Sequence, residues 1–233
     1  GRIVARTLEK LRSFIRPGIA TEEVDRYAED YIRRSGAIPS FKGLYGFPGS
    51  ICISVNEEVV HGIPGKRVLV EGDIVSIDVG AMVGGYHGDA AATVPVGKVD
   101  REAERLIAVT ERSLYKGIEA AQTGQRVSDI SRAIQAYVEG HGFSVVRSFA
   151  GHGIGRAIHE EPQVPNFVVP GERGPLLRPG MTLAIEPMVN AGGYDVVVKE
   201  DRWTVVTKDS SLSAHFEHTI VITPDGPEIL TGL

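Results

Sequence analysis

The chain has 233 residues, 42% of them hydrophobic, which is enough for a globular protein of one large domain or two small ones. Acidic residues outnumber Lys plus Arg by 30 to 25, so the net charge of −5 gives no general basic field for a nucleic-acid partner. No apolar run or signal peptide predicts a membrane partner, and the single cysteine excludes an internal disulfide and a cysteine-rich zinc module and suits the reducing cytoplasm.

Hydrophobic periodicity predicts an α+β protein. Apolar residues at helical spacing predict four helices, at about residues 2–16, 21–35, 100–121 and 127–141. Runs of β-branched residues bounded by Gly, Pro and Asp predict strands at 68–79, 90–96, 181–190, 195–207 and 217–223. No linker, low-complexity segment or block of like charge marks a boundary, so we expect one domain over residues 1–233.

The chain repeats itself. "GDIVSIDVG" from Gly72 aligns without gaps on "GMTLAIEPM" from Gly180, a shift of 108 residues that pairs Asp78 with Glu186. At a shift of 106, the helical segment from Arg16 aligns on the segment from Gln122. We expect two pseudo-symmetric halves, at approximately 1–98 and 99–233, although chance similarity of two helix-to-strand units would look alike.

Four carboxylates stand in apolar surroundings. Asp78 and Glu186 lie inside runs typical of buried strands, and Asp89 and Glu217 have similar settings. A buried unpaired carboxylate is avoided by protonation, ion pairing or metal coordination, and no Lys or Arg alternates along these strands. They are either four separate hydrogen-bonding groups or one convergent cluster. If they converge, two divalent ions would balance their charge, and the oxygen ligands suit a hard or borderline metal.

The segment "AGHGIGRAIHEEP", from Ala150 to Pro162, carries two histidines. His152 stands among glycines, where the backbone can approach other groups closely, and it is the candidate imidazole ligand for the acid cluster. A phosphate-binding loop is a weaker interpretation, because "GHGIG" lacks the Lys-Ser/Thr that follows in a P-loop.

The ordered residues Asp78, Asp89, His152, Glu186 and Glu217, in "IDVG", "YHGDAAAT", "GHGIGRAIHE", "AIEPM" and "FEHT", closely resemble the metal ligands of the type I methionine aminopeptidases. The resemblance extends over nearly the whole chain, including "SFKGLYGFPGSICISVNEEVVHGIPG". It implies the pita-bread fold, in which two pseudo-symmetric halves surround a curved antiparallel sheet with helices outside.

The resemblance also implies roles for these residues. Asp78 would chelate one metal, Asp89 and Glu217 would bridge two, and His152 and Glu186 would complete the other. The cofactors would be two divalent ions, Co, Mn or Fe, with Zn as a further option. Water activated between them would attack the first peptide bond, as in established two-metal aminopeptidases, with Glu186 as general base.

Substrate contacts follow from the same resemblance. His61 and His159 match the two histidines that hydrogen-bond the scissile peptide and its tetrahedral intermediate. Phe47, Cys52 and Trp203 match the positions that line the methionine pocket, and aromatic faces with a sulfur suit a thioether. Leu44 departs from the family, since many bacterial relatives have an aromatic residue there. His87, His141, His215 and His218 are predicted to be structural.

The spacing of the last two motifs separates the branches of the family. The spacing from Glu186 to Glu217 is only 31 positions, without the long insertion of type II enzymes. Proline-directed aminopeptidases and prolidases share the five ligands but usually carry an additional N-terminal domain. A non-catalytic interaction module would have lost ligands. We therefore expect a cytoplasmic enzyme, a monomer compatible with ribosome association, that removes methionine from nascent chains with a small second residue.

Overall fold

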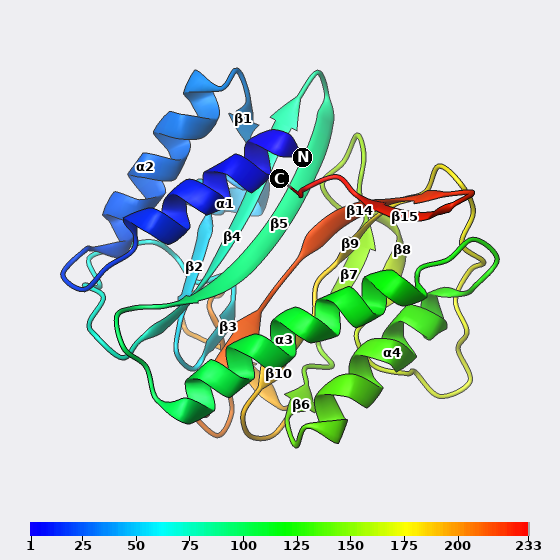
Figure 1. The fold of residues 1–233 in the computed structure, drawn as a ribbon. Coiled ribbons are helices and arrows are strands. Elements are labelled where there is room, and N and C mark those ends of the chain that lie inside the picture. The colour runs from blue at the N-terminus through cyan, green and yellow to red at the C-terminus, as the bar shows by residue number, and fades with distance from the viewer. Residues whose placement is uncertain (233) are drawn as a thin grey trace.

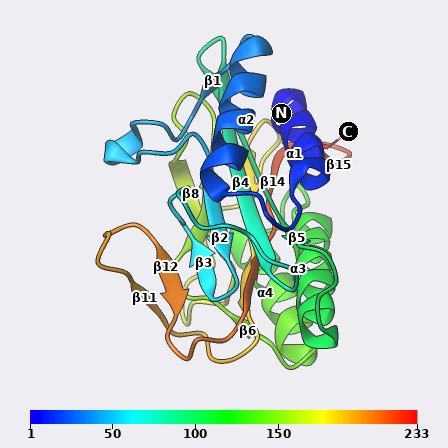
Figure 2. The ribbon, with the colours of Figure 1, turned by 90° about the vertical axis from the view of Figure 1, so that its left-hand side faces the viewer.

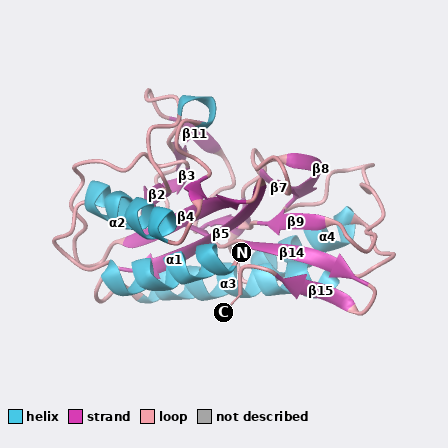
Figure 3. Cartoon of the chain, turned by 90° about the horizontal axis from the view of Figure 1, so that it is seen from above, coloured by secondary structure: helices cyan, strands magenta, loops and turns pink. Residues whose placement is uncertain are grey.

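Four amphipathic helices cover the outer face of a curved antiparallel sheet in the computed structural model, which describes residues 1–232 (Figures 1 and 3). In the first helix Val4, Leu8 and Leu11 recur at helical spacing and are buried. None of the helices in the described residues is long and apolar enough to cross a membrane. The helices are α1 (Arg2–Phe14), α2 (Thr21–Arg34), α3 (Arg101–Ala120) and α4 (Val127–Gly140), close to the four predicted ranges.

The strands form two principal sheets. The first has the order β1-β4-β2, with β5 paired to β4, and the second has the order β15-β14-β9-β7-β8. Two three-stranded sheets, β13-β10-β6 and β11-β12-β3, complete the set. The bounds are β1 Ile38–Pro39, β2 Cys52–Val55, β3 Glu58–Val60, β4 Ile74–Val83, β5 Tyr86–Pro95, β6 Ser144–Val145, β7 Ala150–Gly153, β8 Glu160–Pro165, β9 Thr182–Ile185, β10 Met188–Asn190, β11 Val196–Val198, β12 Val205–Thr207, β13 Ser213–His215, β14 His218–Thr223 and β15 Gly226–Ile229.

Several strand predictions were wrong at their bounds. The predicted strand 68–79 starts only at Ile74, because Leu69 pairs with the segment before α2 and Gly72, at φ 98°, turns the chain. It then continues to a tight turn at Gly84 and Gly85, whose positive φ suits a two-residue hairpin. Pro187 splits the predicted strand 181–190 into β9 and β10, and 195–207 is a hairpin of β11 and β12.

The two halves repeat at the level of single hydrogen bonds. The Gly18 amide donates to Leu69 O at 2.8 Å, and Gly124, 106 residues later, donates to Leu177 O at 3.0 Å. Helices α2 and α4 begin at the same point of the repeat, and an acid three residues on accepts the backbone amide of each N-cap residue. The two pseudo-symmetric halves expected from the sequence are therefore present.

Each half has its own apolar core between its helices and its strands. One core packs α1 and α2 against β2, β4 and β5, and the other packs α3 and α4 against β9, β10, β13 and β14. Figure 2 shows that the β11–β12 hairpin and the short 3₁₀ turn η1 (Leu44–Gly46) project from the face opposite the helices. This helix-free face carries the pocket described next.

Candidate metal centre

Strand register brings the predicted ligands together across both principal sheets. Asp78 is level with Ala91 in the β4–β5 ladder, and Ala91 exchanges backbone hydrogen bonds with Glu217 at the start of β14. Asp89 binds the Thr219 hydroxyl through its amide, at 2.9 Å. Asp89 and Ala91 are two residues apart on one strand, as are Glu217 and Thr219 on the other. Side chains two residues apart lie on the same face, so those of Asp78, Asp89 and Glu217 share one face where the two principal sheets meet.

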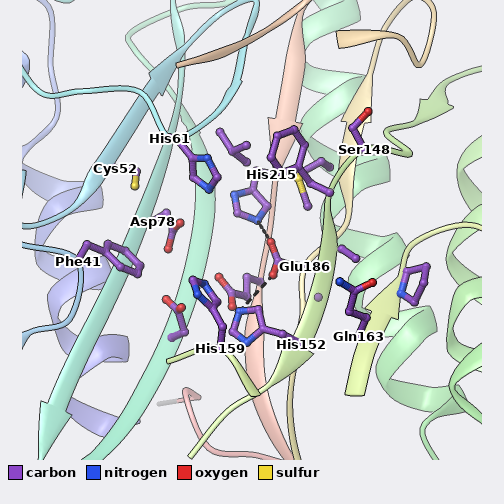
Figure 4. A pocket seen from close by; sticks show the side chains of 18 of the residues that line it. Phe41, Cys52, His61, Asp78, Ser148, His152, His159, Gln163, Glu186 and His215 are labelled. Carbon is purple, nitrogen blue, oxygen red and sulfur yellow. Dashed lines mark ion pairs between the residues drawn. The ribbon is translucent and has the colours of Figure 1, made fainter. Parts of the chain in front are cut away.

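The second half completes this arrangement. Thr219 pairs with Ala184 of β9, and Ala184 pairs with His152 of β7. The neighbouring pair, His218 with Ile185, brings Glu217 alongside Glu186. Five residues far apart in the sequence therefore line one pocket of about 770 Å³ (Figure 4). They are Asp78, Asp89, His152, Glu186 and Glu217.

The cluster is buried, and its ion-pair partners within residues 1–232 are histidines, with no Lys or Arg among them. Asp89 and Glu217 are 3% and 2% exposed, and one oxygen of each, like Asp78 Oδ1, accepts no hydrogen bond from the described residues. Asp89, His152 and Glu217 each present a ligand atom within 4.8 Å of the others. Orphaned buried oxygens of like charge, with an imidazole beside them, fit a divalent cation.

Burial and mutual repulsion disfavour full ionisation of these acids. Burial raises the pKa of Glu186 to about 7 and that of Asp78 to about 6. The pKa values of Asp89 and Glu217 are raised well above their usual range, first by burial and then by the neighbouring carboxylates. A bound cation would reverse this effect, since it favours the charged form.

His152 is oriented for coordination through Nε2. Its Nδ1 lies 2.8 Å from Gly153 O, so the neutral ring carries its proton on Nδ1 and donates to that carbonyl. Nε2 then faces Glu186 Oε1 at 3.4 Å with a free lone pair. A Cβ on Gly151 would lie 2.3 Å from Ala184 O, so the glycine run is required for this strand pairing.

The two other predicted histidines border the same space. His61, at φ 59°, packs edge-on against Phe149, with ring centroids 5.5 Å apart. His159 packs edge-on against His152, at 4.5 Å. Burial lowers the pKa of His61 to about 4 and that of His159 below its usual value, so both rings are neutral at pH 7.

An apolar recess adjoins the acids on the first-half side. Cys52 is level with Asp78 in the β2–β4 ladder, and burial followed by the nearby carboxylates raises the pKa of its thiol. Phe47 meets Trp203 edge-on, with ring centroids 5.2 Å apart. Leu44 packs on the same cluster, and the neighbouring Tyr45 is 81% exposed at the rim.

Sequence reasoning missed one histidine of this site. His215 was predicted to be structural, yet it lines the pocket, is 1% exposed, and places Nε2 at 3.6 Å from Glu186 Oε2. Alternation of side chains along an extended segment was the available signal, because His215, the last residue of β13, is two residues before Glu217. The pocket lining does not include the other three histidines that were predicted to be structural, His87, His141 and His218. The ring of His218 forms a hydrogen bond with the Thr231 hydroxyl. Other unpredicted lining residues are Phe41, Phe149, Gln163, Phe167 and Met188.

Comparison with known proteins places the chain among metallopeptidases, in agreement with the cluster of potential metal ligands. Residues 1–224 match metallopeptidase family M24. The chain is 60% identical over 231 residues to a methionine aminopeptidase of Clostridium perfringens, covering 99% of this chain and 92% of that protein. It is 59% identical over 231 residues to methionine aminopeptidase 1 of Bacillus subtilis, covering 99% and 93%.

Solved structures agree with these sequence matches. The methionine aminopeptidase of Thermotoga maritima superimposes with a TM-score of 0.97 at 50% identity, covering 100% of this chain and 93% of that one. The prolidase of Pyrococcus furiosus has a TM-score of 0.80 at 22% identity and covers 99% of this chain but 61% of that one. The second likeness is one of fold, and both neighbours share the pita-bread architecture that the sequence predicted.

Proposed function

Since this chain belongs to metallopeptidase family M24, we propose that it removes the N-terminal methionine of polypeptides at the pocket described above. It is a metal-dependent aminopeptidase, as are its relatives of 60% and 59% identity. One observation carries the assignment of the site. A cluster of unpaired buried carboxylates directly adjoins an apolar recess lined by aromatic rings and a thiol.

The acids and His152 would hold two divalent ions, with Co, Mn or Fe favoured and Zn as an alternative. Asp78 would bind one ion, His152 and Glu186 the other, and Asp89 and Glu217 both. The compact group of Asp89, His152 and Glu217 supports this division. Bound divalent ions polarise a peptide carbonyl and lower the pKa of a nearby water enough to provide hydroxide near neutral pH.

The remaining chemistry belongs to the side chains. Glu186, which lies at the cluster beside His152, accepts a proton from the attacking water and passes it to the leaving amine. Neutral His61 and His159 donate hydrogen bonds to the scissile peptide and to the negative charge that develops on it. These donors are already fixed before the reaction, which is where such stabilisation is most effective.

Phe47, Cys52 and Trp203 form the floor of the methionine recess, with Leu44 and Tyr45 at its rim. An unbranched thioether fits a recess of aromatic edges and a soft sulfur better than a charged or β-branched side chain does. Phe149 and Met188 also line the pocket and belong to a different apolar cluster from the recess, and we expect these bulky side chains to favour a small residue after the scissile bond.

We place this reaction on nascent chains in the cytoplasm, with the enzyme acting as a monomer. Initiator methionine is available there as soon as a chain leaves the ribosome, so an association with the ribosome would be compatible with the activity. Sedimentation of the purified protein tests the monomer, and co-sedimentation with ribosomes tests the association.

Peptide hydrolysis tests the function. With added Mn²⁺ or Co²⁺, Met-Ala-Ser is expected to lose its methionine, and a chelator should abolish the reaction. Ala-Pro-Ala probes the proline-directed alternative of the same fold. Release of Ala from that peptide, or efficient release of a leading Leu or Lys, would contradict the proposed specificity.

A further inference from the structure

Glu186 lies between two imidazoles, one facing each oxygen of its carboxylate. Oε1 is 3.4 Å from His152 Nε2, and Oε2 is 3.6 Å from His215 Nε2, as the dashed lines in Figure 4 show. The two nitrogens differ in kind. His152 Nε2 carries a lone pair because its Nδ1 donates to Gly153, whereas His215 Nε2 has no hydrogen-bond partner in residues 1–232 although the ring is 1% exposed.

The backbone of His215 is held firmly. Its amide donates to Thr93 Oγ1 at 2.8 Å, and the Thr93 hydroxyl lies 2.9 Å from its carbonyl oxygen. On the other side His215 pairs with Met188 in the β10–β13 ladder. An imidazole fixed in this way can orient a neighbour that is itself less constrained.

Glu186 is that neighbour. It lies between β9 and β10, before Pro187, and outside the register of the β9–β14 ladder. Its carbonyl accepts from Asn166 Nδ2 at 2.9 Å, whereas its two carboxylate oxygens lie 3.4 and 3.6 Å from imidazole nitrogens, longer than normal N–H···O hydrogen bonds. Rotation about its terminal torsion is soft and would exchange the two oxygens.

We propose that His215 is a positioning residue whose Nε2–H donates to Glu186 Oε2 and so keeps Oε1 turned toward the metal site that it shares with His152. The present separation is a few tenths of an ångström longer than an N–H···O hydrogen bond, so a small rotation of the carboxylate closes it. His215 faces Oε2 of Glu186, the oxygen opposite the one that faces His152, so it approaches the carboxylate from the side away from that ligand. The inference rests on the proposed function and adds a group that orients a ligand.

Three substitutions separate a hydrogen-bond donor from a space-filling ring. His215→Gln places an amide nitrogen near the position of Nε2, His215→Asn places it near Nδ1, and His215→Leu removes it. Titration of the metal-free proteins with Mn²⁺ by calorimetry measures affinity without reference to activity. Partners of this kind typically change metal affinity or activity by about 10- to 100-fold. We expect such a loss in the Leu and Asn variants and near-normal affinity in the Gln variant.

Turnover of Met-Ala-Ser provides the second readout, with kcat reduced and KM little changed in the Leu and Asn variants. His218→Leu is the matched control, because His218 is an adjacent imidazole that bonds Thr231 outside the pocket, and it should bind Mn²⁺ normally. If His215→Leu fails to fold, the Gln and Asn pair still decides the question.

Equal Mn²⁺ affinity in the Gln and Asn variants would overturn the proposal, since the position of the donor would then not matter. A raised KM with unchanged affinity would also overturn it and would make His215 a peptide contact. If the unsubstituted protein neither binds Mn²⁺ nor cleaves Met-Ala-Ser, the proposed function fails first and this inference fails with it.

Discussion

Helices α2 and α4 occupy equivalent places in the two halves, and each fastens a segment that borders the pocket. From α2, Asp25 accepts the amides of Ser50 and Ile51, at 2.8 and 3.0 Å. Glu29 accepts the Ser50 hydroxyl at 2.9 Å and the Lys42 ammonium at 2.5 Å. Both ends of the loop that carries Leu44, Tyr45 and Phe47 are therefore tied to one helix.

From α4, the equivalent positions are Ser131 and Gln135, 106 residues later. The Ser131 hydroxyl donates to Pro165 O at 2.5 Å, and Gln135 accepts the Val168 amide at 2.8 Å. The halves thus fasten the pocket at the same helix positions, with charged groups in the first half and neutral groups in the second. The anchoring places are common to both halves, while the chemistry at those places differs.

The same contrast applies to the equivalent acids. Asp78 lies within an unbroken ladder, between β2 and β5, whereas Glu186 lies at a break that ends in Pro187. A ladder fixes the direction of a side chain, and a break leaves it to neighbouring groups. Under the proposed function, Asp78 would be a rigid ligand, and Glu186 would be a carboxylate with freedom to accept and release a proton.

Glu186→Gln and Asp78→Asn test this difference, and the largest effect is expected here. Loss of the general base should reduce kcat by at least about two orders of magnitude, even at saturating metal. Asp78→Asn should weaken metal binding but recover part of its activity as Mn²⁺ is raised. Steady-state kinetics across a Mn²⁺ series measure both. Near-normal turnover of a metal-loaded Glu186→Gln protein would remove the general-base role.

We predict that His152 is a metal ligand and that His159 is a hydrogen-bond donor to the substrate. His152→Ala should lower metal content, whereas His159→Ala should keep metal and lose transition-state stabilisation of roughly 2.7–4 kcal/mol, if it acts like one oxyanion donor. Metal analysis of both purified variants, followed by kinetics, provides the measurement. The assignment would be reversed if His159→Ala emptied the site while His152→Ala left it full.

A metal held by acids from both halves would link them, so its removal should destabilise the whole chain. At a free metal concentration of 100 times Kd, the expected gain in unfolding free energy is about 2.7 kcal/mol per site. In the metal-free protein the pKa values of Asp78 and Glu186 are raised to about 6 and about 7, so the folded state holds protons that the unfolded state releases.

Asp78 and Glu186 therefore contribute fully to the unfolding free energy of the metal-free protein below about pH 4. This contribution is lost as the pH rises toward 7. The difference in Tm between loaded and metal-free protein should grow with pH over this range. Melting curves with Mn²⁺ or with chelator, from pH 5 to 7.5, measure it. Coincident curves at every pH would contradict a shared metal site.

Glu29 and Gln135 occupy equivalent positions in the two halves, so Glu29→Gln makes the first half like the second at this position. We expect its effect on activity to be the smallest of those predicted here. Lys42 first and then Arg33 and Ser50 lower the pKa of Glu29 to about 2, against desolvation that raises it. Neutralising it should cost about 1 kcal/mol or less in stability and raise KM for Met-Ala-Ser by less than about tenfold, with kcat unchanged. A lower kcat with unchanged KM would show that the loop does more than shape the recess.

The helices, the internal repeat and the proposed ligands could be predicted from the sequence, because local patterns along the chain determine them. Helical periodicity placed all four helices, and the repeat placed Asp78 opposite Glu186. Resemblance of short motifs identified the residues that the pocket brings together. Strand ends were less predictable. Leu69 and Val70 have strand composition, but Gly72 turns the chain before the ladder begins.

The helices, the duplication and the five proposed ligands could be identified from the sequence, because periodicity, repeat spacing and motif identity are properties of neighbours along the chain. The groups that surround Glu186 became known from the folded structure. The places of His152 and His215 depend on the register of β7, β9, β10 and β13, and that register is set by hydrogen bonds between segments far apart in sequence. The role of His215, two residues from a predicted ligand, cannot be assigned before those strands pair, because the pairing determines which buried oxygen its ring meets.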